Sequence, residues 1–282
     1  MHLIYRNNFF TYYQGRNGQD RCILDLNKLF QSNGDRVLFE SRWQSFLNSD
    51  SDNTHILFRS SDILEYLTES IIPLFCGSKP RLLLLFGNPA PHSVKAGAMF
   101  SSEGAQREHR LWRFLAQTGV LSFEHRSPDE TFDPAWRVRR LLSTDYDSPF
   151  QIAMSSFISF PSAASHPRWS GVAGVKRLFG ARAFNTLCNS EFDHLRIVLK
   201  DLMPEKGMVV VFQKDAFETL RSTDTPRYSI RSCFSGALIG SIKENPNIFL
   251  GSVAPTRLML SRRAKLTFVK VIKEGLDSIH CV

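Results

Sequence analysis

The chain has 282 residues, of which 43% are hydrophobic and 22% are charged. These proportions are typical of a folded protein and exclude a chain that is disordered throughout. A chain of this length forms one or two domains and can bury a core without a metal or a disulfide. Lys and Arg number 35 against 27 Asp and Glu, so the net charge of +8 favours a polyanionic partner.

Neither a membrane span nor a signal peptide is indicated. The longest apolar run, at 82–86, is far shorter than the roughly 20 residues that a spanning helix needs. The first eight residues lack the apolar stretch of a signal peptide, so we expect a cytoplasmic protein that uses no membrane. The cysteines are Cys22, Cys76, Cys188, Cys233 and Cys281. They are scattered without a closely spaced pair, which indicates reduced thiols and no zinc or iron–sulfur site.

The first 78 residues are polar and aromatic, with helical periodicity at 36–47 and 61–75. In the second of these stretches, apolar residues recur at three- and four-residue steps from Ile63 to Ile72. We therefore expect residues 1–78 to form a helical extension packed on the core.

The register changes after Lys79-Pro80. The continuous apolar run from Arg81 to Phe86 predicts a strand buried on both faces, as in a parallel sheet. It ends at a loop, 87–91, that contains two prolines and a glycine. Residues 103–119 then show a helical pattern that ends at Gly119.

The same alternation of strand, loop and helix continues to the end of the chain. Further strands are expected at 150–160, 208–212 and 247–253, with helices at 215–221 and 261–274. This order predicts an α/β protein with a three-layer α/β/α arrangement around a four-stranded, mainly parallel sheet. The expected domain spans 79–282, with an insertion at 160–205. Ligands of such sheets bind beyond the carboxyl ends of the strands.

The loop after the first of these strands carries two polar side chains, Asn88 and His92, where a ligand would bind. The alternative is a plain turn that ends the strand, since Asn-Pro is common in turns.

The run Gly87-Asn88-Pro89-Ala90, followed by Gly97-Ala98-Met99-Phe100 and a helix, resembles the first motif of the uracil-DNA glycosylase superfamily. It is nearest the mismatch-specific, thymine-DNA-glycosylase-like branch. The resemblance implies that Asn88 positions the hydrolytic water and that Phe100 stacks on the flipped base, with Gly87, Pro89 and Ala90 lining the base site. One departure is that the family's glycine precedes Asn by two positions, whereas Gly87 precedes it by one.

The run from Ile248 to Arg257, followed by a basic segment, is similar to the superfamily's second motif, a strand, His-Pro-Ser, a wedge loop and a helix. Pro255 and Thr256 match it, but Ala254 replaces the histidine that stabilises the departing base. His92 and His166 are the possible substitutes. Leu258 and Met259 occupy the wedge, and the cations beside it would contact phosphates: Arg257, Arg262, Arg263 and Lys265. A solvated helix face is the alternative for these cations.

The second strand ends without the asparagine with which the family often reads the pyrimidine edge. Ser155 or Met154 stands there, and a serine leaves more room and makes fewer fixed hydrogen bonds than an asparagine amide. The insertion combines aromatic and basic residues, among them Arg168 and Trp169, and either contacts DNA or is a packed helical hairpin.

The resemblance implies a monofunctional, monomeric DNA glycosylase that needs no metal or cofactor and acts on double- or single-stranded DNA. The changes at Ser155 and Ala254, together with an insertion at 160–205 that is long enough to wall a larger pocket, favour a bulky modified pyrimidine over uracil, such as a glucosylated hydroxymethylcytosine of phage DNA. The alternatives are a uracil or mismatch repair glycosylase, a catalytically weak DNA-binding member, and a nucleotide- or sugar-handling enzyme.

Overall fold

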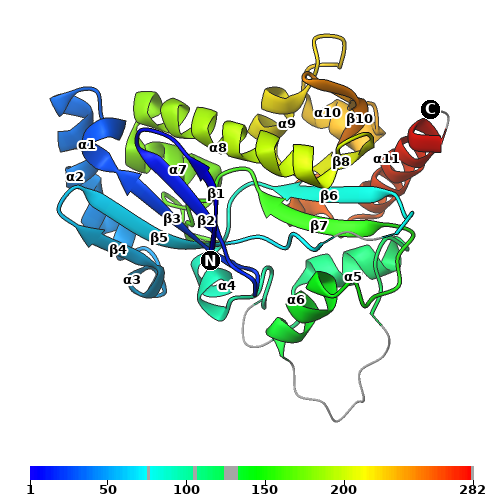
Figure 1. Ribbon diagram of the computed structural model, residues 1–282, viewed down its shortest axis with the longest axis horizontal. Helices are drawn as coiled ribbons and strands as arrows, with labels where there is room; N and C mark the ends of the chain where they lie inside the picture. The colour runs from blue at the N-terminus through cyan, green and yellow to red at the C-terminus, as the bar shows by residue number, and fades with distance from the viewer. Residues whose placement is uncertain (75–76, 104–106, 124–132, 281–282) are drawn as a thin grey trace. The chain divides into compact units, whose positions relative to one another are not determined.

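The computed structural model describes residues 1–74, 77–103, 107–123 and 133–280 (Figure 1). The chain forms two compact units, each built from separate stretches of sequence. The first unit comprises Met1–Ser70, Gly87–Ser101 and Ser156–Val198, and the second comprises Ile71–Phe86, Ser102–Ser155 and Leu199–Val282. The sequence predicted one boundary after residue 78. Each of the two units instead contains residues from both sides of that position.

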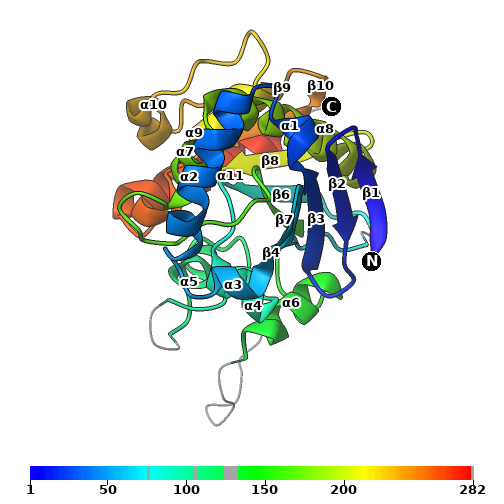
Figure 2. The same ribbon diagram turned by 90° about the vertical axis from the view of Figure 1, so that its left-hand side faces the viewer.

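The first unit is built on a five-stranded antiparallel sheet in the order β1-β2-β3-β5-β4, whose strands β1 to β3 run side by side in Figure 2. The strands are β1 His2–Arg6, β2 Phe10–Gln14, β3 Gln19–Asp25, β4 Leu57–Ser60 and β5 Ile63–Glu69. In β3, Asp20, Cys22 and Leu24 are buried at every second position, which is the period of a strand with one face against a core.

The expected helix at 61–75 is therefore wrong, and so is the helical nature of the N-terminal extension. Residues 63–69 form β5, in which Leu64, Tyr66 and Thr68 are buried in alternation. Ile63 and Leu67, which suggested helical spacing, lie on the other face and are only partly covered. The apolar residues thus occupy both faces of a strand, and this produced the apparent three- and four-residue steps.

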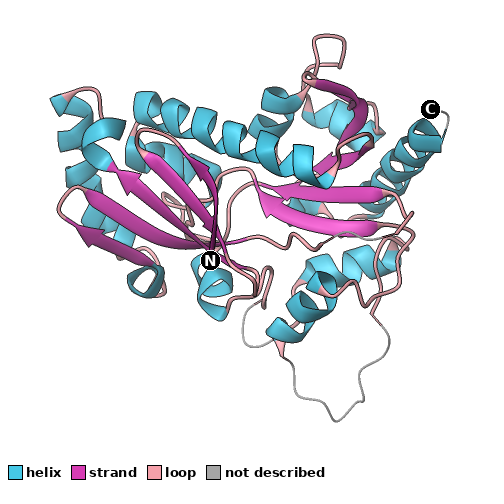
Figure 3. Ribbon diagram, in the orientation of Figure 1, coloured by secondary structure: helices cyan, strands magenta, loops and turns pink. Residues whose placement is uncertain are grey.

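The helices of the first unit are α1 Leu26–Leu29, α2 Asn33–Leu47, α3 Asn53–Ile56, α4 Pro91–Ala96, α7 Gly171–Phe179 and most of α8 Ala181–Leu202. Helix α2 confirms the helix expected at 36–47, and it begins where the Ser32 hydroxyl accepts a hydrogen bond from the amide of Asp35. Helices α7 and α8 show that the insertion at 160–205 is largely helical (Figure 3), and α7 packs against α2. Rings from α2, α7 and the segment before α7 form the aromatic core.

The second unit contains a five-stranded mixed sheet in the order β7-β6-β8-β10-β9. Its strands are β6 Arg81–Phe86, β7 Gln151–Ser156, β8 Gly207–Val211, β9 Ile239–Ile242 and β10 Asn245–Ser252. Strand β8 runs parallel to β6 and β10, and β9 is antiparallel to β10. The α/β class and the four expected strands are confirmed. The short β9, with Gly240 in its middle, was not predicted because it carries no apolar run.

The helices of the second unit are α5 Arg110–Gln117, α6 Pro134–Leu142, α9 Lys214–Leu220, α10 Ile230–Ser235, the 3-10 helix η1 Thr256–Leu258 and α11 Arg262–His280. Helix α5 starts later than the helix expected at 103–119, of which 104–106 lie outside the described residues. Gly119 follows its C-terminus with a φ of 70°, as expected of a glycine cap. Within the described ranges, no helix combines the length and the apolar character needed to cross a bilayer.

Aromatic rings join the sheet of the second unit to its helices. Phe86 of β6 stacks on Phe212, with ring centroids 4.8 Å apart, and Phe268 of α11 contacts both Phe212 and Phe114 of α5. Helix α11 approaches β10 closely because Gly251 has no side chain: an added Cβ would lie 2.3 Å from a methyl carbon of Val271. The core of this unit thus lies where the expected parallel strands meet the C-terminal helix.

Candidate functional site

The loop after β6 and the segment after β7 lie side by side in the first unit. The strand expected at 150–160 ends at Ser156, so residues 157–160 are not part of it. The amide of Ile158 donates to the carbonyl oxygen of Gly87 at 2.9 Å, and the amide of Ser162 donates to that of Pro89 at 3.1 Å. The loop after β6 is therefore hydrogen-bonded along the segment after β7. We call residues 87–90 and 157–162 together the paired loops.

The side chain of Asn88 is anchored between the paired loops. Its amide nitrogen Nδ2 donates to the carbonyl oxygen of Phe160 at 3.2 Å and to the hydroxyl of Ser162 at 2.8 Å. Ser162 in turn donates to the carbonyl oxygen of Gly171 at 3.2 Å. A backbone carbonyl can only accept a hydrogen bond, so the nitrogen and not the oxygen of the amide faces Phe160. The oxygen Oδ1 accepts no hydrogen bond from a described residue and remains available to a water or a ligand.

Phe100 lies in the same unit, in a loop that turns back on α4. The amide of Ala98 donates to the carbonyl oxygen of Ser93 at 3.1 Å. The amide of Ser101 donates to the hydroxyl of Ser93 at 3.3 Å. Phe100 has a φ of 53°, in the left-handed region that a bulky side chain rarely adopts. Such strain costs on the order of 1–3 kcal/mol and is concentrated at functional sites. The Phe100 side chain itself is half-exposed.

His92 is on the second residue of α4, which begins at Pro91. Its side chain is half-exposed. Helix α4 is held within the first unit by two polar contacts: Gln19 donates to the carbonyl oxygen of Val94 at 2.8 Å, and Lys95 pairs with Asp52 at 2.7 Å. His92 is therefore carried on a fixed helix that starts directly after the paired loops.

The paired loops rest on a buried polar network that sequence reasoning did not identify. The backbone amide of Ser159 donates to Glu191 Oε1 at 2.8 Å, and its hydroxyl donates to the same oxygen. The carbonyl oxygen of Ser159 accepts a hydrogen bond from the hydroxyl of Thr68 at 2.7 Å. The hydroxyl of Tyr66 lies 2.8 Å from the hydroxyl of Ser159. Serines spaced through an otherwise apolar run, as in 155–162, are the signal that could have indicated such a network.

Burial governs the ionisation of this network. It raises the pKa of Glu191 to about 8, because the charged form would lose its hydration. Burial also raises the pKa of Asp20 to about 6. Tyr12 donates to this carboxylate at 2.6 Å, which by itself would lower the pKa. Burial also lowers the pKa of His194, which stacks on Tyr12, to about 3.

These shifts predict that stability falls as the pH rises. Between about pH 6.5 and 8, folded Glu191 retains a proton that the unfolded chain, with its ordinary value near 4.5, has already lost. The folded state then binds more protons, so the free energy of unfolding decreases with pH. His194 is neutral in the folded state, whereas the unfolded chain still binds part of a proton there near the ordinary pKa of 6.5. This opposes the trend at the lower end of the window and vanishes toward pH 8. We expect Glu191→Gln to flatten the stability profile in this window, measured by urea unfolding at several pH values. A wild-type profile that rises with pH would contradict the assignment.

Ser155 and Ser156 end β7. Ser155, expected to take the place of an edge-reading asparagine, is buried with 7% of its surface exposed. The hydroxyl of Ser156 is also buried and has no hydrogen-bond partner among the residues that the structure describes. An unsatisfied buried hydroxyl is costly, so Ser156 is a second missed residue with unused hydrogen-bonding capacity at this strand end.

In the second unit, the residues of the expected DNA-binding motif follow β10. Ala254 is buried, Pro255 and Thr256 are half-exposed, and Arg257 and Leu258 are exposed. Met259 is fully buried, so its prediction as part of an exposed wedge is wrong. The reason is that the turn of η1 directs Leu258 outward and the following residue inward.

Helix α11 confirms the basic helix expected at 261–274. Arg262 and Arg263 are exposed, and Lys265 is half-exposed. Arg263 also donates to the carbonyl oxygen of Phe234 at 3.2 Å, which ties its guanidinium to α10. Arg262 is therefore the simpler candidate for a phosphate contact.

Trp169, expected to contact DNA, lies in the core of the first unit with 1% of its surface exposed, so that prediction is wrong. Its indole nitrogen donates to the hydroxyl of Ser45 at 3.1 Å, and its ring packs edge-on against Phe46. A large ring whose nitrogen finds a hydrogen-bond partner, here on α2, is better placed in the core than in water. Arg168 is exposed, with its guanidinium 4.8 Å from the centre of the Trp169 ring.

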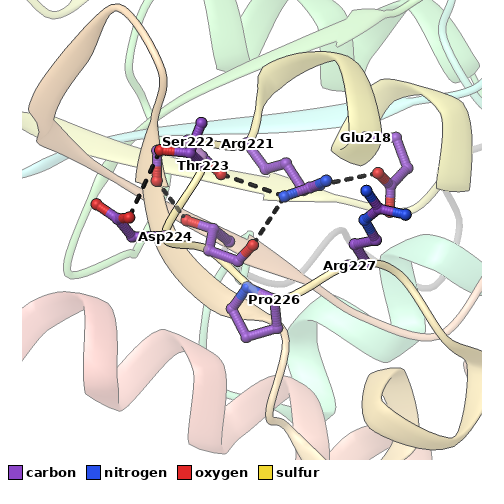
Figure 4. Close-up of a pocket in the computed structure, with 8 residues that line it drawn as sticks. Glu218, Arg221, Ser222, Thr223, Asp224, Pro226 and Arg227 are labelled. Carbon is purple, nitrogen blue, oxygen red and sulfur yellow. Dashed lines mark hydrogen bonds and ion pairs between the residues drawn. The ribbon is translucent and has the colours of Figure 1, made fainter.

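A cavity of about 430 Å³ opens elsewhere, between α9 and the loop before α10 (Figure 4). Its central cation, Arg221, donates to Glu218 at 2.8 Å and to the carbonyl oxygens of Ser222 and Thr225. The guanidinium thus holds the loop in place. None of the residues expected at the site lines this cavity.

Neither a family model nor a curated protein matches this sequence. In the part of the chain that the structure describes, no group of three or more His, Cys, Asp or Glu side chains is arranged to hold a metal ion. The function must therefore be argued from the paired loops and the exposed cations.

Proposed function

We propose that this chain is a monofunctional DNA glycosylase, a divergent member of the uracil-DNA glycosylase superfamily. It hydrolyses the N-glycosidic bond of a flipped, modified pyrimidine and leaves an abasic site. The observation that carries the proposal is the anchored amide of Asn88, whose nitrogen is occupied by Phe160 and Ser162 while its oxygen accepts nothing from the described residues.

This arrangement suits the positioning of a water. Cleavage of a glycosidic bond passes through an oxocarbenium-like sugar, and the nucleophile must meet the anomeric carbon from a defined side. Asn88 Oδ1 accepts a hydrogen bond from the water and orients it. An amide is not a strong base, so the reaction needs a leaving base that departs readily. Phe100 provides the stacking surface, and its strained backbone fixes the ring.

The exposed side chains after β10 support DNA as the substrate. Leu258 is the apolar wedge that fills the space of the flipped nucleotide, and Arg257 and Arg262 contact neighbouring phosphates. Ala254 cannot donate a hydrogen bond to the departing base. His92, on the helix that starts after the paired loops, is the candidate donor.

The proposed base is a bulky modified cytosine, such as glucosylated hydroxymethylcytosine, and the proposed role is defence against phage DNA. Small side chains at Ser155 and Ala254 give up hydrogen bonds to a small base, which weakens selection for it, and leave space for a substituent. The insertion does not add to this case, because Trp169 packs in the core instead of lining a pocket.

A competition assay tests both activity and substrate. Equal amounts of duplex bearing glucosylated hydroxymethylcytosine and duplex bearing uracil are incubated with the protein, and abasic sites are cleaved with alkali. We expect strand breaks mainly in the first duplex, and none with Asn88→Ala. Faster cleavage of the uracil strand would overturn the substrate. An absence of breaks in both, and in a thymine-mismatch duplex, would overturn the activity.

A further inference from the structure

Three arginines of the first unit are linked through backbone carbonyl groups. Arg42 of α2 donates from Nη1 to the carbonyl oxygen of Arg177 in α7 at 2.6 Å. Arg177 donates from its own Nη1 to the carbonyl oxygen of Arg168, and Arg168 lies over the ring of the buried Trp169. We call Arg42, Arg168 and Arg177 the α7 arginine cluster.

The charge of this cluster is not compensated. None of its three members forms an ion pair with a described residue, and neither does the neighbouring Lys176. Other arginines of the same unit are neutralised: Arg36 and Arg59 both pair with Glu40 at 2.6 Å. Placing several cations together without a carboxylate is unfavourable unless an anion binds there. The cluster is thus a fixed set of cations that lacks its counter-charge.

The geometry leaves donors available for an anion. Arg42 and Arg177 each use one terminal nitrogen for a carbonyl oxygen, and Arg168 is held by its ring contact. A guanidinium has five N–H donors in a planar fork, which matches the oxygens of a phosphate. Holding the side chains in advance reduces the entropy lost on binding.

We propose that the α7 arginine cluster binds the phosphate backbone of a nucleic acid strand, outside the base-excision site. The exposed side chains of α7 favour this partner over a membrane. They are Ala173, Lys176 and Arg177, whereas a helix that docks on lipid presents large apolar residues. Helix α7 also reaches the paired loops, because the carbonyl oxygen of Gly171 accepts from Ser162, which holds Asn88.

The inference rests on the proposed function in one respect, namely that the strand is DNA. It extends the DNA contact expected at Arg168 to Arg42 and Arg177, which lie outside both expected motifs. It also places these cations on the helix whose Gly171 accepts from Ser162, the residue that holds Asn88. Contacts of this kind do not depend on base sequence, so they contribute affinity but no selectivity.

The test compares two variants that remove equal charge. Arg168→Gln/Arg177→Gln removes two members of the cluster, and Arg6→Gln/Arg16→Gln removes two exposed arginines of the same unit. Binding of an unmodified duplex is measured by fluorescence anisotropy at several salt concentrations. We expect the cluster variant to lower the salt slope by about two, since each lost phosphate contact removes about 0.9. The control should shift it far less.

Two further measurements keep the outcomes distinct. Arg168→Lys/Arg177→Lys retains charge but loses the fork, and should weaken binding with a nearly unchanged slope. Single-turnover base release at saturating enzyme should match wild type in the Arg6→Gln/Arg16→Gln control. Equal slopes for the cluster variant and its control would overturn the inference, as would cluster-dependent binding to anionic vesicles without binding to DNA. A wild-type protein that binds DNA through the cluster but releases no base would overturn the proposed function and leave this inference standing.

Discussion

Asn88→Ala is expected to lower the single-turnover rate of base release by about 100-fold or more, the scale of losing a positioned proton-transfer or water-binding group. The variant keeps the backbone hydrogen bonds of the paired loops, from Ile158 to Gly87 and from Ser162 to Pro89. Duplex affinity and the unfolding midpoint should therefore change little. Asn247→Ala, which truncates an exposed asparagine in β10, is the matched control and should behave as wild type.

Ser162→Ala extends this experiment by loosening Asn88 without removing it. The amide then loses its 2.8 Å acceptor but keeps the carbonyl oxygen of Phe160. We expect a rate between those of wild type and Asn88→Ala, since a group that is no longer held in one orientation is present but less effective. If Asn88→Ala turns over at the wild-type rate, Asn88 does not position the water.

Trp169→Ala should destabilise the protein by about 3–5 kcal/mol, as expected when a large, fully buried ring is truncated. Trp169 contacts Phe46 edge-on and donates to Ser45 at 3.1 Å, so the substitution leaves a cavity and an unpaired hydroxyl. Urea unfolding monitored by circular dichroism measures the effect. Trp169→Phe keeps most of the ring and should cost much less.

Trp169→Ala also distinguishes a core role of Trp169 from the DNA contact that its sequence context suggested. A ring that stacks on a base would lower DNA affinity without lowering stability. If Trp169→Ala unfolds at the wild-type urea concentration but binds DNA more weakly, the buried placement is wrong.

A local sequence pattern predicted an element correctly wherever it was compatible with only one kind of secondary structure. The run at 81–86 is apolar at nearly every position, and only a strand covered on both faces accommodates it. The strands β7, β8 and β10, the helices α2 and α11, and the cap at Gly119 followed from the same local rules. For the same reason Asn88 could be placed directly after a strand, on a loop that its prolines constrain.

What the sequence could not provide was the partner of each segment. At 61–75, apolar side chains on two faces imitate a helical period, and only pairing with β3 and β4 makes β5 a strand. Trp169 and Met259 resemble exposed contact residues until packing assigns them to the core. The anchoring of Asn88 by Phe160 and Ser162 joins residues more than seventy positions apart, as does the buried contact of Ser159 with Thr68. The sequence by itself determined the α/β class, four strands of one sheet and the chemistry available after those strands. Which side chains face one another was decided by tertiary packing, because burial and hydrogen bonding between distant segments leave no local periodicity to read.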